Sequence, residues 1–235
     1  MLGIRVSCQA ESNYWPSFTS KTIRQVIIVG DPNLDKKWHL KDGRILYLRC
    51  RDGWENLPEK MIAAYSAVAQ IPEFREHTHF IKLDRDSSIT HKFRAHRSPL
   101  IKSLDYAGPV IHTPHRTLAG VYHLGRVSET SPWYNKRYRE FRGQPTYRFP
   151  FHLGGNSYIL SRKAINILRS YYTFENLHLV EQEHIYEDLM VGMLLKMNGI
   201  SPRKISYGIY NKSGYGENQK RATTYLKNNP HIWRT

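Results

Sequence analysis

The sequence has 235 residues, of which 40% are hydrophobic, so it is long enough to bury a core and is not a disordered tail. Its 35 Lys and Arg residues against 20 Asp and Glu give a formal net charge of +15, which favours anionic binding partners such as nucleic acid, nucleotide, anionic glycan or a membrane surface. Two cysteines, Cys8 and Cys50, exclude a disulfide framework and a four-cysteine zinc site. They either form one bridge or stay free, and buried free thiols are favoured.

Targeting and linker signals are absent from the sequence. The longest aliphatic run, residues 26–29, is far too short to span a membrane, and the amino terminus has no apolar signal core. Unless it was excised from a longer protein, the chain is expected to have no signal peptide or membrane span and to be soluble in the cytoplasm, or in the host cell if a virus encodes it. Without an internal repeat or low-complexity linker, residues 1–235 are predicted to form one domain.

The first ninety residues alternate between predicted strands and a helix. Strands are expected at residues 2–8, 24–30 and 43–50, because these runs are rich in β-branched or apolar residues and the last two stop at turn signals. Residues 55–71 carry apolar side chains three and four positions apart, which predicts a helix. It leads into the apolar strand of residues 80–86. This order predicts βαβ units and a mainly parallel α/β sheet.

The later part of the chain is more irregular. Short strands are predicted at residues 110–112, 121–124 and 126–128, and residues 133–151 form a long loop rich in Tyr, Arg and Pro. Ser161 is predicted to cap one helix. A second helix is predicted over residues 186–200, with Leu189, Met193, Leu194 and Met197 on its buried face and Gly199 at its C-cap position.

Two acidic pairs are candidates for chemistry. The segment FIKLDRD, residues 80–86, would release Asp84, Arg85 and Asp86 at the carboxyl end of a strand, where α/β sheets bind ligands and where carboxylates can hold a divalent cation. An ordinary solvated surface turn would explain the same residues. Glu187 and Asp188 begin the second helix, where they complement the helix dipole or aim a catalytic base into a cleft.

These motifs together resemble the β-1,3-galactosyltransferase and Fringe-like family of glycosyltransferases. FIKLDRD is similar to its metal strand, HLGGNSYILS to its Gly-Gly segment and YEDLMVGMLLKMNGI to its Glu-Asp-Val helix. WENLPEKMIAAY resembles the helix start that precedes the metal strand. The four motifs keep the family's order across residues 44–200. The resemblance implies an A-type glycosyltransferase fold: a Rossmann-like, mostly parallel sheet flanked by helices, with a nucleotide-sugar half (1–90) and a mixed-strand acceptor and catalytic half (91–235).

Three positions depart from the family pattern. Arg85 stands in the middle of the acidic triplet where the family usually has Asp, which leaves an Asp, any residue, Asp pattern. His152 replaces a frequent Cys before the Gly pair, and Asn156 replaces a third small residue. The departures bear on the donor sugar and the disulfide pattern more than on the reaction.

The resemblance implies inverting transfer of a hexose, nominally galactose, from a UDP-sugar to a carbohydrate or glycoprotein acceptor. Asp86, assisted by Asp84, would hold Mn²⁺ or Mg²⁺ against the diphosphate. Asp188 would take the proton of the acceptor hydroxyl, with Glu187 as the substitute candidate. Arg85 lies between the two metal-binding acids and is counted with them on the donor side.

Four further residues are assigned by the same resemblance. Gly154 and Gly155 would line the donor sugar, and Lys60 would contact the nucleotide side. His231 is the candidate for a late histidine that completes the metal shell, although an exposed histidine is the commoner explanation. Trp133, Tyr134 and Tyr138 would either stack on acceptor sugars or pin the loop that contains them.

Two other functional classes compete. The charge and the 12% aromatic content also fit a non-catalytic single-strand nucleic-acid or polyanion binder, which would not need the ordered acidic motifs. A metal-dependent phosphoryl-transfer enzyme or nuclease would use the same acids, but the sequence has no P-loop or related signature. The glycosyltransferase is therefore the leading prediction, and nucleic acid is an unexpected partner.

Overall fold

The computed structural model describes residues 1–17, 22–53, 56–85, 87–89, 93, 98–112, 152–154, 157–184 and 186–211. Several predicted features lie outside these residues: Asp86, Gly155, Asn156 and His231 among the site residues and their neighbours, the strands at 121–128, and the aromatic loop with Trp133, Tyr134 and Tyr138.

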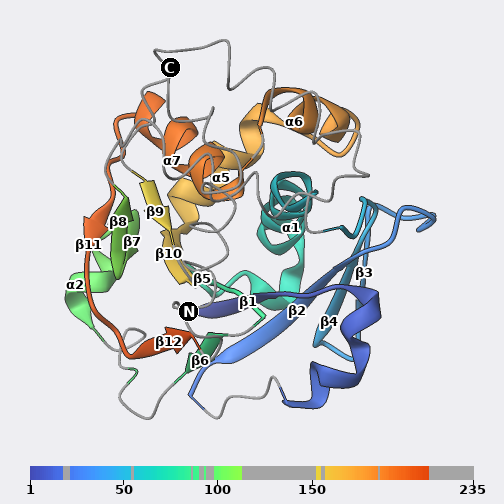
Figure 1. Ribbon diagram of the computed structural model, residues 1–235, viewed down its shortest axis with the longest axis horizontal. Coiled ribbons are helices and arrows are strands. Elements are labelled where there is room, and N and C mark those ends of the chain that lie inside the picture. The colour runs from blue at the N-terminus through green and yellow to red at the C-terminus, as the bar shows by residue number, and fades with distance from the viewer. Residues whose placement is uncertain are drawn as a thin grey trace, which may run out of the picture.

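A single large sheet organises the molecule (Figure 1). Its strands lie in the order β11-β7-β10-β5-β1-β2-β4-β3. Their bounds are β1 (Leu2–Val6), β2 (Arg24–Gly30), β3 (Trp38–Lys41), β4 (Ile45–Leu48), β5 (His79–Leu83), β7 (Tyr106–Gly108), β10 (Ser157–Ser161) and β11 (Arg203–Lys204). All of them run in one direction except β3 and β10, which pair antiparallel with their neighbours. The predicted α/β class with a mostly parallel sheet is confirmed.

The centre of the sheet has the strand order of a nucleotide-binding fold. From β1 the chain moves outward through β2 to β4 on one side, and β5 then lies on the other side of β1. The order therefore reverses between β1 and β5. In open α/β sheets, ligands bind outside the carboxyl ends of the strands at such a switch point. The segments that follow β1 and β5 are the 3-10 helix η1 (Gln9–Ser17) and the loop at Asp84.

The helices that carry the larger core lie on one face of the sheet, as Figure 1 shows. They are α1 (Leu57–Gln70), α5 (Arg162–Tyr171), α6 (Leu177–Glu183) and α7 (Glu187–Met197). Alternation along the strands sends Leu2, Ile4 and Phe80 to this face. Ile81 and Leu83 point to the other face and its smaller core. That core also includes Ile101 of α2 (Pro99–Lys102) and packs against the paired strands β6 (Ser87–Ile89) and β12 (Ile209–Asn211).

The remaining described elements are short. The turn η2 (Pro72–Phe74) follows α1, and β8 (Val110–His112) pairs antiparallel with β9 (His152–Gly154). No helix in the described part of the chain is long and apolar enough to cross a bilayer. Both cysteines are free thiols, and burial raises the pKa of Cys50 to about 12.

Most predicted elements agree with the structure within a few residues. The strand at β2 and the helices α1, α5 and α7 are confirmed, and the Ser161 hydroxyl accepts a hydrogen bond from the Ala164 amide as a cap. Gly199 has the left-handed φ of 75° expected after a helix end. The strand β3 and the helix α6 were not predicted, because their sequences are short and mostly polar.

The predicted buried face of α7 was correct in part. Leu194 is buried and Met193 packs against the core, as expected, but Met197 is 66% exposed. The buried apolar side chains are Met190, Val191, Leu194 and Leu195, which follow Glu187 at intervals of three, four, seven and eight positions and so share one helix face. The buried stripe therefore begins with an acid, and the predicted face is displaced from the observed one.

Candidate active site

A buried lysine on β5 is the centre of the candidate site. Phe80 and Lys82 are two residues apart and therefore share the helix-covered face of the sheet. The Lys82 side chain is 3% exposed, and its Nζ lies 2.6 Å from Oδ1 of Asp84, the next residue in the same alternation. An isolated buried ammonium is costly, so it requires negative partners.

Helix α7 supplies two more carboxylates to the same ammonium. Lys82 Nζ lies 3.4 Å from Oε2 of Glu187 and 3.9 Å from Oδ1 of Asp188. We call these four residues the Lys82 cluster. The two acidic pairs that are about a hundred residues apart in the sequence are thus brought together in the fold, through Asp84 on one side and Glu187 with Asp188 on the other.

Asp188 has an unusual environment within this cluster. Its Oδ1 is buried and accepts no hydrogen bond from any residue that the structure describes. The ammonium at 3.9 Å is too distant for a hydrogen bond. A buried oxygen that is left without a donor costs stability, so its place in this cluster requires an explanation.

The charges of the cluster shift the pKa of its members. Burial alone would lower the pKa of Lys82, but Asp84, Glu187 and Asp188 outweigh it and raise that pKa well above its usual range. Burial, the charge of Asp188 and its hydrogen bond with the Glu187 side chain, and the charge of Asp84 raise the pKa of Glu187 well above its usual range, although Lys82 opposes the shift. The cluster therefore keeps its ammonium charged and favours the neutral form of Glu187.

Buried tyrosines surround the cluster. Tyr158 lies directly opposite Lys82 in the β10 and β5 pairing, and its ring centroid is 5.5 Å from the ammonium. The Tyr158 hydroxyl donates a hydrogen bond to Oε1 of Glu187 and lies 2.7 Å from the hydroxyl of Tyr65 on α1. These contacts fix both ends of the Lys82–Glu187 pair.

A third tyrosine connects the cluster to the predicted donor-sugar segment. The ring of Tyr106 meets Tyr158 edge to face at 5.9 Å, and its hydroxyl accepts a hydrogen bond of 2.8 Å from the Leu153 amide. Leu153 precedes Gly154, which is the last residue of β9 and is buried. Gly154 is therefore held near the tyrosines that pack against Lys82.

The loop after β5 is anchored from β1. Arg5 is 3% exposed, and its Nη1 donates to the carbonyl oxygens of Asp84, Arg85 and Ser87 at 3.0, 3.3 and 2.9 Å. The guanidinium of Arg85 forms an ion pair with Glu11 on η1. Because η1 follows β1, this pair connects the two segments on either side of the switch point.

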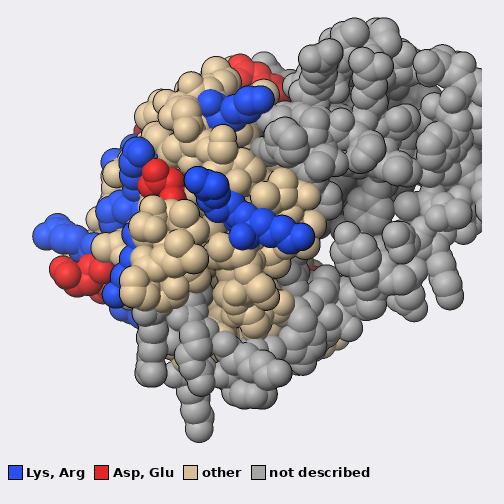
Figure 2. Space-filling view, turned by 90° about the vertical axis from the view of Figure 1, so that its left-hand side faces the viewer, with Lys and Arg blue, Asp and Glu red and all other residues tan. Residues whose placement is uncertain are grey.

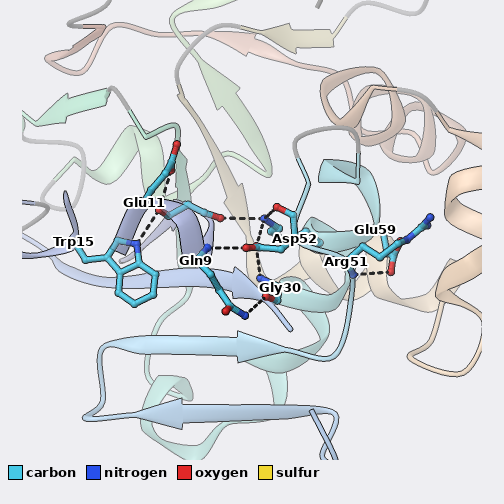
Figure 3. Close-up of polar contacts among 9 residues, drawn as sticks. Gln9, Glu11, Trp15, Gly30, Arg51, Asp52 and Glu59 are labelled. Carbon is cyan, nitrogen blue, oxygen red and sulfur yellow. Dashed lines mark hydrogen bonds and ion pairs between the residues drawn. The ribbon is translucent and has the colours of Figure 1, made fainter. Parts of the chain in front are cut away.

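A second buried lysine organises the neighbouring strand ends (Figure 3). Asp52 accepts hydrogen bonds from the amides of Gln9 and Gly30, at 2.7 and 2.6 Å, and from Nζ of Lys60 at 2.7 Å. Lys60 also donates to the carbonyl oxygens of Ser7 and Asp52, both at 3.0 Å. We call these five residues the Asp52 cluster.

The Asp52 cluster ties the segments after β1, β2 and β4 to the start of α1. Gly30 is required there, since a Cβ at this position would lie 2.5 Å from the carbonyl oxygen of Arg51. Beside the cluster, Arg51 pairs with Glu59 at 2.7 Å. The predicted nucleotide-side residue Lys60 lies at this end of the sheet, and its ammonium donates to Ser7 and Asp52.

The donor set for a divalent cation is only partly described. Asp84 offers hard carboxylate oxygens on a side chain that is 33% exposed, at the carboxyl end of a central strand. Within the described residues, no group of three His, Cys, Asp or Glu side chains could hold a metal ion. Mg²⁺ and Mn²⁺ sites built from one or two carboxylates and substrate phosphates do not need such a group, so Asp84 fits this chemistry.

The described surface shows how the excess positive charge is spread. Figure 2 shows one face on which Lys and Arg outnumber Asp and Glu, with uncharged and acidic side chains between them. Exposed basic residues include Lys102, Lys163, Arg203 and Lys204, and Lys163 pairs with Asp105 at 2.9 Å. The basic residues on this face are separated by other surface.

The sequence interpretation missed several residues that organise the site. Lys82 was quoted only as a part of FIKLDRD, and Arg5 was not singled out, although each is a charged residue inside an otherwise apolar strand. Their burial is the informative signal, because charged residues are buried only with partners. Tyr65, Tyr106 and Tyr158 had no sequence signal that separates them from ordinary core residues.

Comparison with known proteins agrees with the motifs. A family model described as Galactosyltransferase matches residues 9–206. Comparison with curated protein sequences gave no significant match. The matching solved structures include a protein described as a glucose-1-phosphate thymidylyltransferase from Bacillus anthracis in complex with sucrose, with a TM-score of 0.43, 10% identity, and coverage of 96% of this chain and 95% of that one. That likeness is too weak to carry an argument. The family match spans most of the chain, which therefore belongs to the Galactosyltransferase family and is a glycosyltransferase.

Proposed function

We propose that this glycosyltransferase moves a hexose, nominally galactose, from a UDP-sugar to a carbohydrate hydroxyl with inversion, and that it depends on a divalent cation. The single observation that carries the proposal is Oδ1 of Asp188, a buried carboxylate oxygen without a hydrogen-bond donor among the described residues. A general base needs an oxygen that is free to take a proton.

Asp188 is favoured over Glu187 as the base. Glu187 accepts a hydrogen bond from the hydroxyl of Tyr158, and burial with neighbouring acids raises its pKa, which favours the neutral form over the carboxylate that a base needs. Asp188 is the more exposed of the two, at 19% against 2% for the side chain of Glu187. Asp188 would take the proton of the acceptor hydroxyl as that oxygen attacks the anomeric carbon, and Glu187 remains the substitute candidate.

The donor would lie at the switch point. Asp84 and Asp86 are proposed to hold Mn²⁺ or Mg²⁺, with His231 as a further candidate ligand. A cation bound there would offset the negative charge that grows on the departing nucleotide. Arg85 and Lys60 are proposed on the nucleotide side, and Gly154 and Gly155 along the donor sugar. The acceptor is proposed to be a free or protein-linked carbohydrate.

The test measures UDP release from UDP-galactose, UDP-glucose, UDP-N-acetylglucosamine and UDP-xylose with Mn²⁺, with and without saccharide acceptors. Asp188→Asn is expected to lower kcat by about 10²–10⁴-fold, the usual contribution of a general base. Its melting temperature in the presence of UDP and Mn²⁺ should still rise, because ligand binding to the native state stabilises it.

Lys163→Ala provides the control, since it removes an exposed lysine paired with Asp105 and should leave kcat unchanged. Full activity in Asp188→Asn would overturn the role of this residue. If the wild-type protein released no UDP from any of the four donors and gained no stability from UDP with Mn²⁺, the proposed reaction itself would be rejected.

A further inference from the structure

Lys82 is the described residue that contacts both sides of the candidate active site. Its ammonium binds Asp84 at 2.6 Å on the loop that follows β5, and it pairs with Glu187 and Asp188 on α7 at 3.4 and 3.9 Å. The proposed donor side and the proposed base therefore share one cation.

Asp84, Glu187 and Asp188 converge in a poorly solvated place, where negative charges repel one another, and the raised pKa of Glu187 reflects this repulsion together with its burial. The side chains of Glu187 and Lys82 are 2% and 3% exposed, so water screens these charges poorly. Asp84 and Asp188 belong to different elements. A single ammonium between them opposes the repulsion and sets how far apart the two carboxylates lie.

The position of the ammonium is itself fixed. The Tyr158 ring lies 5.5 Å from Nζ, and the Tyr158 hydroxyl holds the Glu187 carboxyl. The Tyr65 hydroxyl, 2.7 Å away, supports that of Tyr158 from α1. Lys82 is thus held by packing and by hydrogen bonds around its partners, as a group that orients reacting residues needs to be.

We propose that Lys82 is a positioning residue for sugar transfer: its ammonium holds the Asp84 carboxylate of the donor side and the Asp188 carboxylate of the base in one geometry. The assignment rests on the transferase activity proposed above. Lys82 acts through the two aspartates, and neither the sugar nor the nucleotide needs to touch it.

The competing explanation is that Lys82 only supports the fold, as any paired buried lysine does. The two explanations differ in what they predict for catalysis. A structural role predicts lost stability with an unchanged kcat in the fraction that stays folded. A positioning role predicts that kcat falls much more than the affinity for the donor, since misplaced reacting groups slow the chemical step.

The experiment removes the side chain and returns the ammonium separately. In Lys82→Ala, kcat for UDP release is expected to fall about 100-fold, the cost typical of a misplacement of about 1 Å. KM for the UDP-sugar should change far less, and UDP with Mn²⁺ should still raise the melting temperature. n-Propylamine replaces the deleted atoms from Cγ to Nζ, so millimolar propylamine at neutral pH is expected to restore part of kcat.

Two further variants keep the test decisive. Where Lys82→Ala does not fold because three acids then lack their cation, Lys82→Ala combined with Glu187→Gln removes one of those acids and is assayed for the same rescue. Lys163→Ala, which deletes an exposed lysine outside the candidate active site, reports what propylamine does to kcat without a cavity at Lys82. Rescue specific to the Lys82 variants supports the proposal.

Three outcomes would overturn the positioning role. These are a kcat in folded Lys82→Ala equal to that of the wild type, a fall in kcat that propylamine does not relieve, and an equal gain in kcat when propylamine is added to Lys163→Ala. The proposed function is tested separately by Asp188→Asn. If Asp188→Asn is inactive while Lys82→Ala keeps its kcat, only the role of Lys82 fails; if the wild type releases no UDP, both fail.

Discussion

Lys60 and Lys82 are matched in burial and in their shortest ion pair, and they differ in the charge around them. Both side chains are 3% exposed, and their Nζ atoms lie 2.7 and 2.6 Å from a carboxylate oxygen. Among the described residues, Lys60 has one carboxylate, Asp52, and its other partners are neutral carbonyl oxygens. Lys82 has three carboxylates.

The difference is one between a balanced ion pair and an unbalanced cluster of charges. In the Asp52 cluster one cation meets one anion, and backbone amides and carbonyls complete the hydrogen bonds, so folding gains a connection between strand ends. In the Lys82 cluster the acids outnumber the cation, and one oxygen of Asp188 has no hydrogen-bond donor in the described structure. An arrangement that costs stability is expected where function requires it.

The largest effect in this comparison is expected from Asp52→Asn. The change leaves the Lys60 ammonium buried without its carboxylate, and breaking a buried ion pair on one side costs about 3–5 kcal/mol of unfolding free energy. Urea denaturation followed by circular dichroism measures the loss. As a control, Lys163→Ala breaks an exposed pair of 2.9 Å and should cost less than about 1 kcal/mol.

A loss for Asp52→Asn no larger than that of Lys163→Ala would contradict the structural role of the Asp52 cluster. It would mean that the amides of Gln9 and Gly30, which also bind this side chain, provide the whole of its stabilising effect. The Lys60–Asp52 pair could then no longer serve as the example of a buried lysine that one carboxylate stabilises.

The matched change in the Lys82 cluster, Glu187→Gln, is expected to have the opposite sign. Burial and neighbouring acids raise the pKa of Glu187, so the folded state binds this proton more tightly than the unfolded state. Stability then falls as pH rises from the ordinary glutamate pKa of about 4.3 towards the raised pKa. Glutamine resembles the neutral form and avoids this loss.

The measurement follows the melting temperatures of wild type and Glu187→Gln across pH. The variant should be more stable at neutral pH, and its advantage should shrink as pH falls from the raised pKa towards about 4.3 and be absent below that, where glutamate is neutral in both states. A variant that is less stable at neutral pH would show that the attraction between Glu187 and Lys82 outweighs the repulsion among the acids.

The order of the central strands and helix could be predicted from the sequence, because the spacing of apolar residues and the turn-forming residues are properties of each short segment by itself. The run at β2 has a buried apolar stripe and stops at a turn, and α1 has apolar residues at helical spacing. The strand β3 could not be predicted, since its four residues are half-exposed and gain their structure from pairing with β4. Such a strand depends on its neighbour rather than on its own composition.

The candidate site was predicted by residue type and order, and its organisation was not. The fold brings the predicted Asp84, Glu187 and Asp188 together around Lys82, and their catalytic and metal-binding roles stay predictions. Their contact through Lys82 depends on which face of β5 meets α7, and this is set by tertiary packing. The orientation of α7 shows the limit most clearly, because Glu187 takes a buried position that hydrophobic periodicity gives to an apolar residue.

The Glu11–Arg85 ion pair is exposed, unlike the two lysine pairs, and we expect it to contribute least to the free energy of unfolding. The Arg85 side chain is 60% exposed, so water and salt screen the pair. A double-mutant cycle with Glu11→Gln and Arg85→Gln, measured by urea denaturation, should give a coupling of about 0.2–1 kcal/mol that decreases at high salt. A coupling as large as that between Asp52 and Lys60 would mean that burial does not set the strength of these pairs. The contrast between the two buried lysines would then rest on geometry rather than on desolvation.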